Sequence, residues 1–205
     1  MQFTGFTQHD FDTFHIEGLE DRMEAIQQRI QPKFKALGDV LTDDLSAMVG
    51  SEMFLHIAKH ARRTVNPPKD TWLAIAGNKR GYKQHPHFQV GLFDDHVFIW
   101  LAYIYELPNK TSIAKNLLKN IKSIENSIPS DFVVSLDHMK KESTSMADIN
   151  LKEALIRFRD VKKAEFLIGR HIEANDTILR DRDRFIDFVK ETFETLVPIY
   201  RLAFS

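Results

Sequence analysis

Basic and histidine residues are concentrated in one stretch of the chain, residues 56–87. This stretch contains seven lysine and arginine residues and one acid, Asp70, a net charge of +6, whereas the whole chain carries −1. The planar arginine side chain makes two parallel hydrogen bonds to phosphate or carboxylate, so the composition predicts an anion-binding site. The candidate anion-binding residues are Arg62, Arg63, Lys69, Lys79, Arg80 and Lys83.

Two connections between predicted strands supply these cations, ARRTVNPPKD (61–70) and GNKRGYKQHP (77–86). The strand between them spans about 26 Å at roughly 3.3 Å per residue, too far for its two ends to hold one phosphate. We therefore expect one group at residues 62–69 and a second at 79–83. A nucleic acid would contact both groups and a small phosphorylated ligand only one, and ordinary solvated surface charge is the alternative.

The first connection is stiffened by Asn66-Pro67-Pro68. Proline fixes its own φ near −65° and pushes the preceding residue towards extended conformations. A stiff connection would hold the neighbouring cations in place before a ligand arrives. A rigid loop that only covers the core fits the same residues.

Histidines beside these cations raise the alternative of an enzyme, because imidazole transfers protons near neutral pH. Asp137-His138 follows a predicted strand and could form an acid–base pair, although adjacent residues usually point in different directions. The candidate pocket histidines are His60, His85, His87 and His138.

His85 and His87 are also candidates for metal binding, since residues i and i+2 of a strand point the same way. Pro86 between them disturbs strand pairing, and the chain has no cysteine. We therefore predict no tightly bound transition metal and no cofactor. The nucleotide-binding, zinc-protease and serine-hydrolase motifs GxxxxGK[ST], GxGxxG, HExxH and GxSxG are also absent from the sequence.

Hydrophobic spacing predicts the elements that position these residues. Apolar residues three and four apart predict a long helix over 19–49, either kinked near Pro32 or divided there into two stacked helices. Alternation then predicts four strands. The order is α-β-β-β-β-α-β-α-β-α, an α+β fold with a mainly antiparallel sheet of about six strands. The predicted strands are 53–60, 71–78, 87–93, 96–105, 131–136 and 164–172, and the later helices are 113–128, 151–161 and 183–200.

Composition limits the class of protein. The 205 residues are 43% hydrophobic, enough for one substantial core, and we expect a single domain over 1–205. The longest apolar run, 97–104, is far shorter than the roughly 20 residues that cross a membrane, so no membrane association is expected. The N-terminal residues lack the basic and apolar regions of a secretory signal, and a cytoplasmic location is expected.

Several long segments resemble one known family: FHIEGLEDRMEAI, HIAKHARRTVNPPKDTW, NKRGYKQHPHFQVGLF, LDHMK and VKKAEFLIGRHI. Together they are similar to the YktB-like family of uncharacterised bacterial proteins, a domain of unknown function. The resemblance covers residues from about 11 to about 200. It implies a single α+β domain in the bacterial cytoplasm, and it implies no activity, cofactor or catalytic residue.

The functional hypothesis therefore rests on the basic and histidine residues described above. The leading one is a non-enzymatic or regulatory module that binds an anionic ligand, either a phosphorylated small molecule or a nucleic acid, through the basic segment 59–83. An enzyme with a histidine-containing pocket is the first alternative. A protein–protein adaptor whose basic loops meet an acidic surface is the second.

Overall fold

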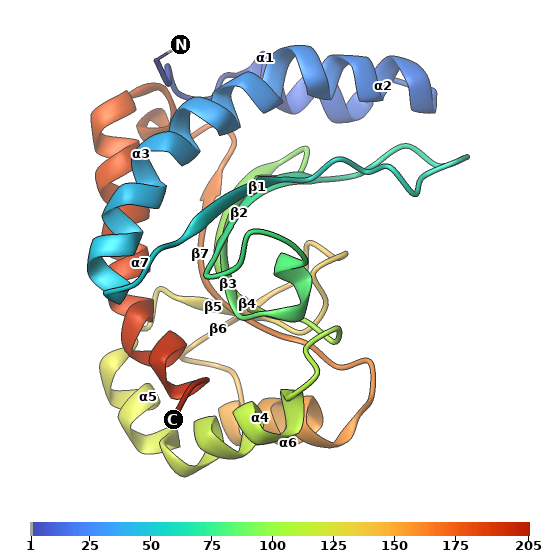
Figure 1. The fold of residues 1–205 in the computed structure, drawn as a ribbon. Coiled ribbons are helices and arrows are strands. Elements are labelled where there is room, and N and C mark those ends of the chain that lie inside the picture. The colour runs from blue at the N-terminus through green and yellow to red at the C-terminus, as the bar shows by residue number, and fades with distance from the viewer. Residues whose placement is uncertain (1) are drawn as a thin grey trace.

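An antiparallel sheet forms the centre of the computed structural model, which describes residues 2–205 (Figure 1). Its strands are β1 (Phe54–Ile57), β2 (Thr71–Ala76), β3 (His87–Leu92), β4 (His96–Tyr103), β5 (Val133–Ser135), β6 (Thr144–Ser145) and β7 (Phe166–Glu173). Their spatial order is β1-β2-β3-β4-β7-β5-β6, with every neighbouring pair antiparallel. The predicted α+β class and mainly antiparallel sheet are confirmed.

β4 is the middle strand, and all eight of its residues are buried. Its sequence is apolar on both faces, which is typical of a strand whose two faces are both covered. Val97, Ile99 and Leu101 join the main core on the helical side. Phe98 and Trp100 on the opposite face belong to a second, smaller core.

One face of the sheet is covered by helices (Figure 1). The long α3 and α7 lie side by side against it, and α4 and α6 pack on each other at the other end of the sheet. The helices are α1 (Gln8–Phe11), α2 (Leu19–Ala25), α3 (Gln31–Val49), α4 (Lys110–Lys119), α5 (Ile121–Ser127), α6 (Leu151–Asp160) and α7 (Arg182–Leu202).

The predicted helix over 19–49 forms with an irregularity just before Pro32. A π-helical turn, Ile26–Ile30, joins α2 to α3 and places Pro32 in the first turn of α3, where a missing backbone N–H is tolerated. Asn150 caps the start of α6, since its Oδ1 accepts the backbone N–H of Glu153 at 3.1 Å. α7 continues through Pro198 to Leu202, beyond the predicted end.

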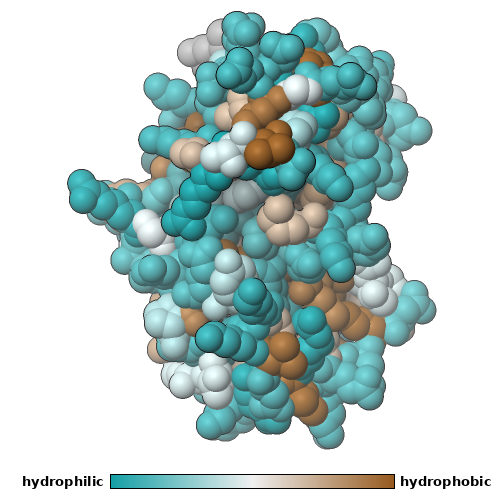
Figure 2. Space-filling model, turned by 90° about the vertical axis from the view of Figure 1, so that its right-hand side faces the viewer, coloured by the Kyte–Doolittle hydropathy of each residue, from teal (hydrophilic) through white to brown (hydrophobic). Residues whose placement is uncertain are grey.

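Loops rather than helices cover the second face of the sheet. The chain after β2 passes through a 3-10 turn, Tyr82–Gln84, and Tyr82 packs on the second core. The connection between β1 and β2, residues 58–70, extends away from the body of the molecule and is called the basic arm below (Figure 1). Figure 2 views the molecule from the side towards which this arm extends, and the surface there is mainly hydrophilic with small separate hydrophobic groups.

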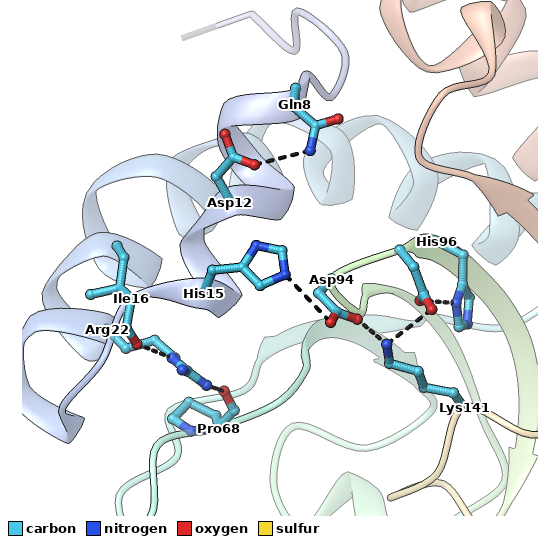
Figure 3. Close-up of polar contacts among 10 residues, drawn as sticks. Gln8, Asp12, His15, Ile16, Arg22, Pro68, Asp94, His96 and Lys141 are labelled. Atoms are coloured by element: carbon cyan, nitrogen blue, oxygen red, sulfur yellow. Dashed lines mark hydrogen bonds and ion pairs between the residues drawn. The ribbon is translucent and has the colours of Figure 1, made fainter.

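Polar contacts fix the base of the basic arm against the N-terminal helices (Figure 3). Arg22 donates from Nε to the carbonyl of Ile16 at 2.8 Å and from Nη1 to the carbonyl of Pro68 at 3.0 Å. Lys141 bridges Asp94 and Asp95 and ties the loop after β5 to the β3–β4 turn. These contacts hold one end of the arm at Pro68.

Candidate functional site

A pocket of about 510 Å³ lies on the second face of the sheet, beside Trp72. We call it the Trp72 pocket. Its apolar walls are Ala58, Ala61, Trp72, Tyr82 and Met139. Its volume lies within the range of small-molecule sites, about 300–1,000 Å³.

Cations from two separate connections meet at this pocket. Lys59, Arg62 and Arg63 reach it from the basic arm, and Lys83 reaches it from the connection after β2. Glu106 is the one acidic side chain among the lining residues. The pocket wall therefore carries a clear excess of positive charge, which favours an anionic ligand.

Lys83 does not lie at the far end of β2, where it was expected. Gly81, with φ of +66°, turns the chain so that the following residues fold back across the sheet. Tyr82 Oη then accepts a hydrogen bond from Trp72 Nε1 at 3.0 Å, and Lys83 Nζ lies 5.3 Å from the Trp72 ring centroid. The expected grouping of Lys83 with Lys79 and Arg80 is therefore wrong, because strand length alone does not show this reversal.

The other candidate cations lie elsewhere. Lys69 shares a second, smaller pocket with Arg22, Asp94 and Lys141, so it is separated from Arg62 and Arg63. Lys79 Nζ lies 5.1 Å from the Phe54 ring centroid, and Arg80 is exposed. Of the six predicted anion-binding residues, the structure brings three together: Arg62, Arg63 and Lys83.

His60 lines the Trp72 pocket in an unusual backbone conformation. Its φ of +50° lies in the left-handed region, which non-glycine residues adopt infrequently and which is found preferentially at functional sites. Its Nε2 lies 3.1 Å from Thr71 Oγ1. Burial, reinforced by the charges of Arg63 and Lys83, lowers the pKa of His60 to about 4, so its ring is neutral at pH 7.

His138 also packs against Trp72, with 6.2 Å between the ring centroids in an edge-to-face arrangement. Its Nδ1 lies 2.7 Å from Glu165 Oε2, and its backbone N–H donates to the same oxygen at 2.8 Å. Glu165 was not predicted as a site residue, because a single glutamate before an apolar strand carries no distinctive pattern. Its burial is visible only once β5 and β7 pair.

Asp70 is a second acid that sequence reasoning did not select. It is 1% exposed, and its Oδ2 has no hydrogen-bond partner among the described residues. Burial raises the pKa of Asp70 to about 6, opposed by the charges of His138, Arg63 and Lys83. A buried acid with a raised pKa beside a pocket is more frequent at functional sites than elsewhere.

The remaining candidate histidines are placed differently. His87 is fully buried beneath Tyr82, its Nδ1 is 2.7 Å from the carbonyl of His85, and its Nε2 is 2.9 Å from Gln89 Nε2. Both of its ring nitrogens are therefore engaged. His85 lines a separate pocket with Tyr200 and Phe204, so His85 and His87 do not share an ion-binding geometry.

Asp137, His138 and Glu165 place one potential metal-ligand atom each within 4.8 Å of one another. Hydrogen bonds within the protein already use these atoms: Glu165 accepts both N–H groups of His138, and Asp137 Oδ1 accepts the backbone N–H of Met139 at 3.0 Å. These hydrogen bonds fix the start of the loop after β5. The absence of a tightly bound transition metal stays a prediction.

The buried histidines predict acid-sensitive folding. Burial lowers the pKa of His87 and of His171 to about 3, against about 6.5 in an unfolded chain. The stabilisation from keeping them neutral is complete above pH 6.5 and is lost as pH falls from there towards 3, at most about 2 kcal/mol per histidine by pH 5. Urea unfolding at pH 7.5 and pH 5 should show a smaller pH dependence in the His87→Gln/His171→Gln variant than in the wild type. The exposed-site control His9→Gln should behave like the wild type, and equal slopes in all three proteins would contradict this assignment.

Taken together, the fold and site define a class: an α+β domain whose antiparallel sheet is covered by helices on one face and by loops around a cationic pocket on the other. The chain belongs to the family described as domain of unknown function DUF1054, whose model matches residues 6–200. It is 62% identical over 199 residues to a UPF0637 protein of Oceanobacillus iheyensis, covering 97% of this chain and 96% of the relative. It is 57% identical over 205 residues to a UPF0637 protein of Shouchella clausii (100% and 97%), and 51% identical over 203 residues to one of Listeria monocytogenes (99% of each chain).

These matches confirm the resemblance to an uncharacterised bacterial family. Across residues 2–205, the structure contains no helix long and apolar enough to cross a membrane.

Proposed function

We propose that the protein binds a small anionic ligand, of the class of phosphorylated metabolites, in the Trp72 pocket. The observation that carries the proposal is the meeting of Arg62, Arg63 and Lys83 from two separate connections at one cavity. Two arginines provide paired donors for phosphate oxygens, and the lysine adds a third positive charge. In this proposal the chain acts as one domain in the cytoplasm.

The pocket walls favour a ligand with an apolar or ring-shaped part next to its anionic group. Trp72, Tyr82 and Met139 line the pocket together with the cations. Burial raises the pKa of Tyr82 to about 12, so its hydroxyl stays protonated and can donate to a ligand. Apolar lining residues with a few converging polar groups are typical of small-molecule sites.

A nucleic acid is the second candidate, supported by the exposed basic arm. Lys59, Arg62 and Lys69 are exposed along it, and Val65 is 76% exposed. A long polyanion would engage the arm outside the pocket and would lose affinity steeply as salt concentration rises. In the alternative of a protein–protein adaptor, the same exposed residues of the basic arm would contact an acidic surface of another protein.

The test is a paired charge reversal. The Arg62→Glu/Arg63→Glu variant should lose at least tenfold in affinity for members of a panel of nucleoside and sugar phosphates, because each charge-assisted hydrogen bond contributes about 1.5–3 kcal/mol. Thermal shift finds the binders in the panel, and calorimetry measures their affinity. The matched control, Lys79→Glu/Arg80→Glu, should bind as the wild type does, because neither residue lines the pocket.

Two results would argue against the small-ligand proposal. Equal loss in both variants would indicate a general electrostatic effect of the basic segment. Binding by the wild type to heparin but to no panel member, with salt-sensitive loss in the Arg62→Glu/Arg63→Glu variant, would favour the nucleic-acid reading.

A further inference from the structure

The side chain of His138 is held in one orientation by a buried acid. Glu165 is 3% exposed and accepts both the ring N–H and the backbone N–H of His138. When a carboxylate accepts a hydrogen bond from Nδ1–H, the proton of the neutral ring is on Nδ1, and Nε2 is the nitrogen that can accept a proton. Within residues 2–205, Nε2 of His138 makes no hydrogen bond to a protein group and is not enclosed as an unpartnered buried atom.

Two observations place this imidazole next to the Trp72 pocket. Its ring and that of Trp72, which lines the pocket, pack in an edge-to-face arrangement, and the next residue, Met139, lines the pocket as well. Its side chain is 10% exposed, so the ring is held firmly but is not sealed from solvent. An imidazole oriented by a buried carboxylate is suited to act as a general base, and the cations near it would bind an anionic substrate.

We propose that the Trp72 pocket is an active site that hydrolyses a phosphate ester, with His138 as the general base and Glu165 as its positioning residue. This proposal rests on the proposed function, because the cations that would bind the anion are the same. Arg62 and Arg63 would hold the phosphoryl oxygens and stabilise the charge that develops on them in the transition state. His60, neutral and also at the pocket, remains available as a hydrogen-bond donor or acceptor.

The proton and electron balance of the step is simple. A water oxygen forms a bond to phosphorus and gives one proton to His138 Nε2. The bond between phosphorus and the ester oxygen breaks, and its electron pair stays with that oxygen, which takes a proton from the Lys83 ammonium. His138 then releases its proton to solvent, which returns one to Lys83, so that the products are an alcohol and a phosphate.

The test uses two chromogenic probes, 4-nitrophenyl phosphate and bis(4-nitrophenyl) phosphate, and a probe that cannot be hydrolysed in this way, phenylphosphonate. The wild type should hydrolyse at least one of the two esters. In His138→Gln, kcat should fall at least 100-fold, because general-base catalysis typically contributes about 10²–10⁴. Binding of phenylphosphonate, measured by calorimetry, should stay within about twofold, and the exposed-site control His9→Gln should leave both quantities unchanged.

Glu165→Gln separates positioning from a purely structural role. The amide of that variant can donate to Nδ1, which favours the ring tautomer with its proton on Nε2, and that tautomer cannot accept a proton from water. We expect a loss in kcat of at least 100-fold with KM nearly unchanged.

The two proposals fail in different ways. If the wild type binds phenylphosphonate but hydrolyses neither ester, the catalytic inference is wrong and the binding proposal stands. If the wild type neither binds phenylphosphonate nor hydrolyses either ester, both are wrong for this class of ligand. Hydrolysis that persists unchanged in folded His138→Gln and Glu165→Gln protein would also overturn the inference.

Discussion

Replacing Asp70 with asparagine is expected to stabilise the protein by about 3 kcal/mol at pH 8. Burial raises the pKa of Asp70 to about 6, above the unfolded value of 3.8, because the charged carboxylate is removed from water and its Oδ2 has no partner in the described part of the chain. Above pH 6 the folded protein must therefore hold a poorly solvated charge. Asparagine has nearly the same shape and removes that charge.

The sign of the effect can be checked by its pH dependence. For an acid with a raised folded-state pKa, the destabilisation is absent below about pH 3.8, grows through the interval to pH 6 and is complete above it. The advantage of Asp70→Asn in urea unfolding should therefore fall to about half when pH is lowered from 8 to 5. The exposed-site control Asp39→Asn should change stability by less than about 0.5 kcal/mol. A destabilised Asp70→Asn protein at pH 8 would show that the carboxylate is better solvated than its burial indicates.

This prediction bears on function as well as on stability. Asp70 lowers the stability of the folded protein at neutral pH and lies close to Arg63 and Lys83. A residue that costs stability in this way is typical of a functional site, where activity rather than stability determines the residue. Removing its charge should also leave the cations at the pocket less compensated. Anion affinity in Asp70→Asn is therefore expected to rise or stay constant, not to fall.

Replacing Gly169 with alanine is expected to cost more than about 4 kcal/mol and to prevent normal folding. Gly169 lies in the middle of β7, opposite Trp100 on β4 and Val133 on β5. A Cβ atom there would lie 1.8 Å from the carbonyl oxygen of Ile99 and 2.9 Å from its carbonyl carbon. These are backbone atoms of the central strand, so the clash cannot be relieved by turning a side chain.

The matched control for this substitution is Gly77→Ala. The nearest atoms to a Cβ at Gly77 are Tyr200 Oη at 3.6 Å and Met53 Sδ at 4.0 Å, which are ordinary contact distances. Gly77→Ala should remain soluble, with a melting temperature close to that of the wild type. Soluble Gly169→Ala protein with a wild-type melting temperature would show that β4 and β7 separate more easily than their pairing indicates.

The parts of the fold that were predicted correctly are those with strong apolar patterns. Alternation at Phe88, Val90 and Leu92 identified β3, because only those residues face the main core. The helix predicted over 113–128 is divided at Asn120 into α4 and α5, and the apolar spacing continues across the break. β6 was missed because its two residues, Thr144 and Ser145, show no alternation and pair only with β5.

The candidate site was predicted in part. What the prediction missed is the reversal of the chain after Gly81, which brings Lys83 to the pocket. The basic composition of residues 56–87 identified Arg62, Arg63 and Lys83 as anion-binding candidates, and the structure places these three at one pocket. Their meeting depends on the reversal after Gly81, which a strand-length argument does not contain. The acids Asp70 and Glu165 were not selected, because what makes them unusual is burial, and an isolated acid in a sequence does not show whether it is buried.

The positions of the two tryptophans allow ligand binding to be followed by intrinsic fluorescence. The chain contains two tryptophan residues, and both Trp72 and Trp100 lie on the loop-covered face of the sheet. Trp72 lines the pocket and donates its indole N–H to Tyr82, whereas Trp100 is 4% exposed and contacts His171 at 4.8 Å between ring centroids. Emission from Trp72 should therefore respond to occupancy of the pocket, while Trp100 reports on the interior beside it. A Trp100→Phe protein would isolate the first emission, so that ligand association could be followed in real time without any label.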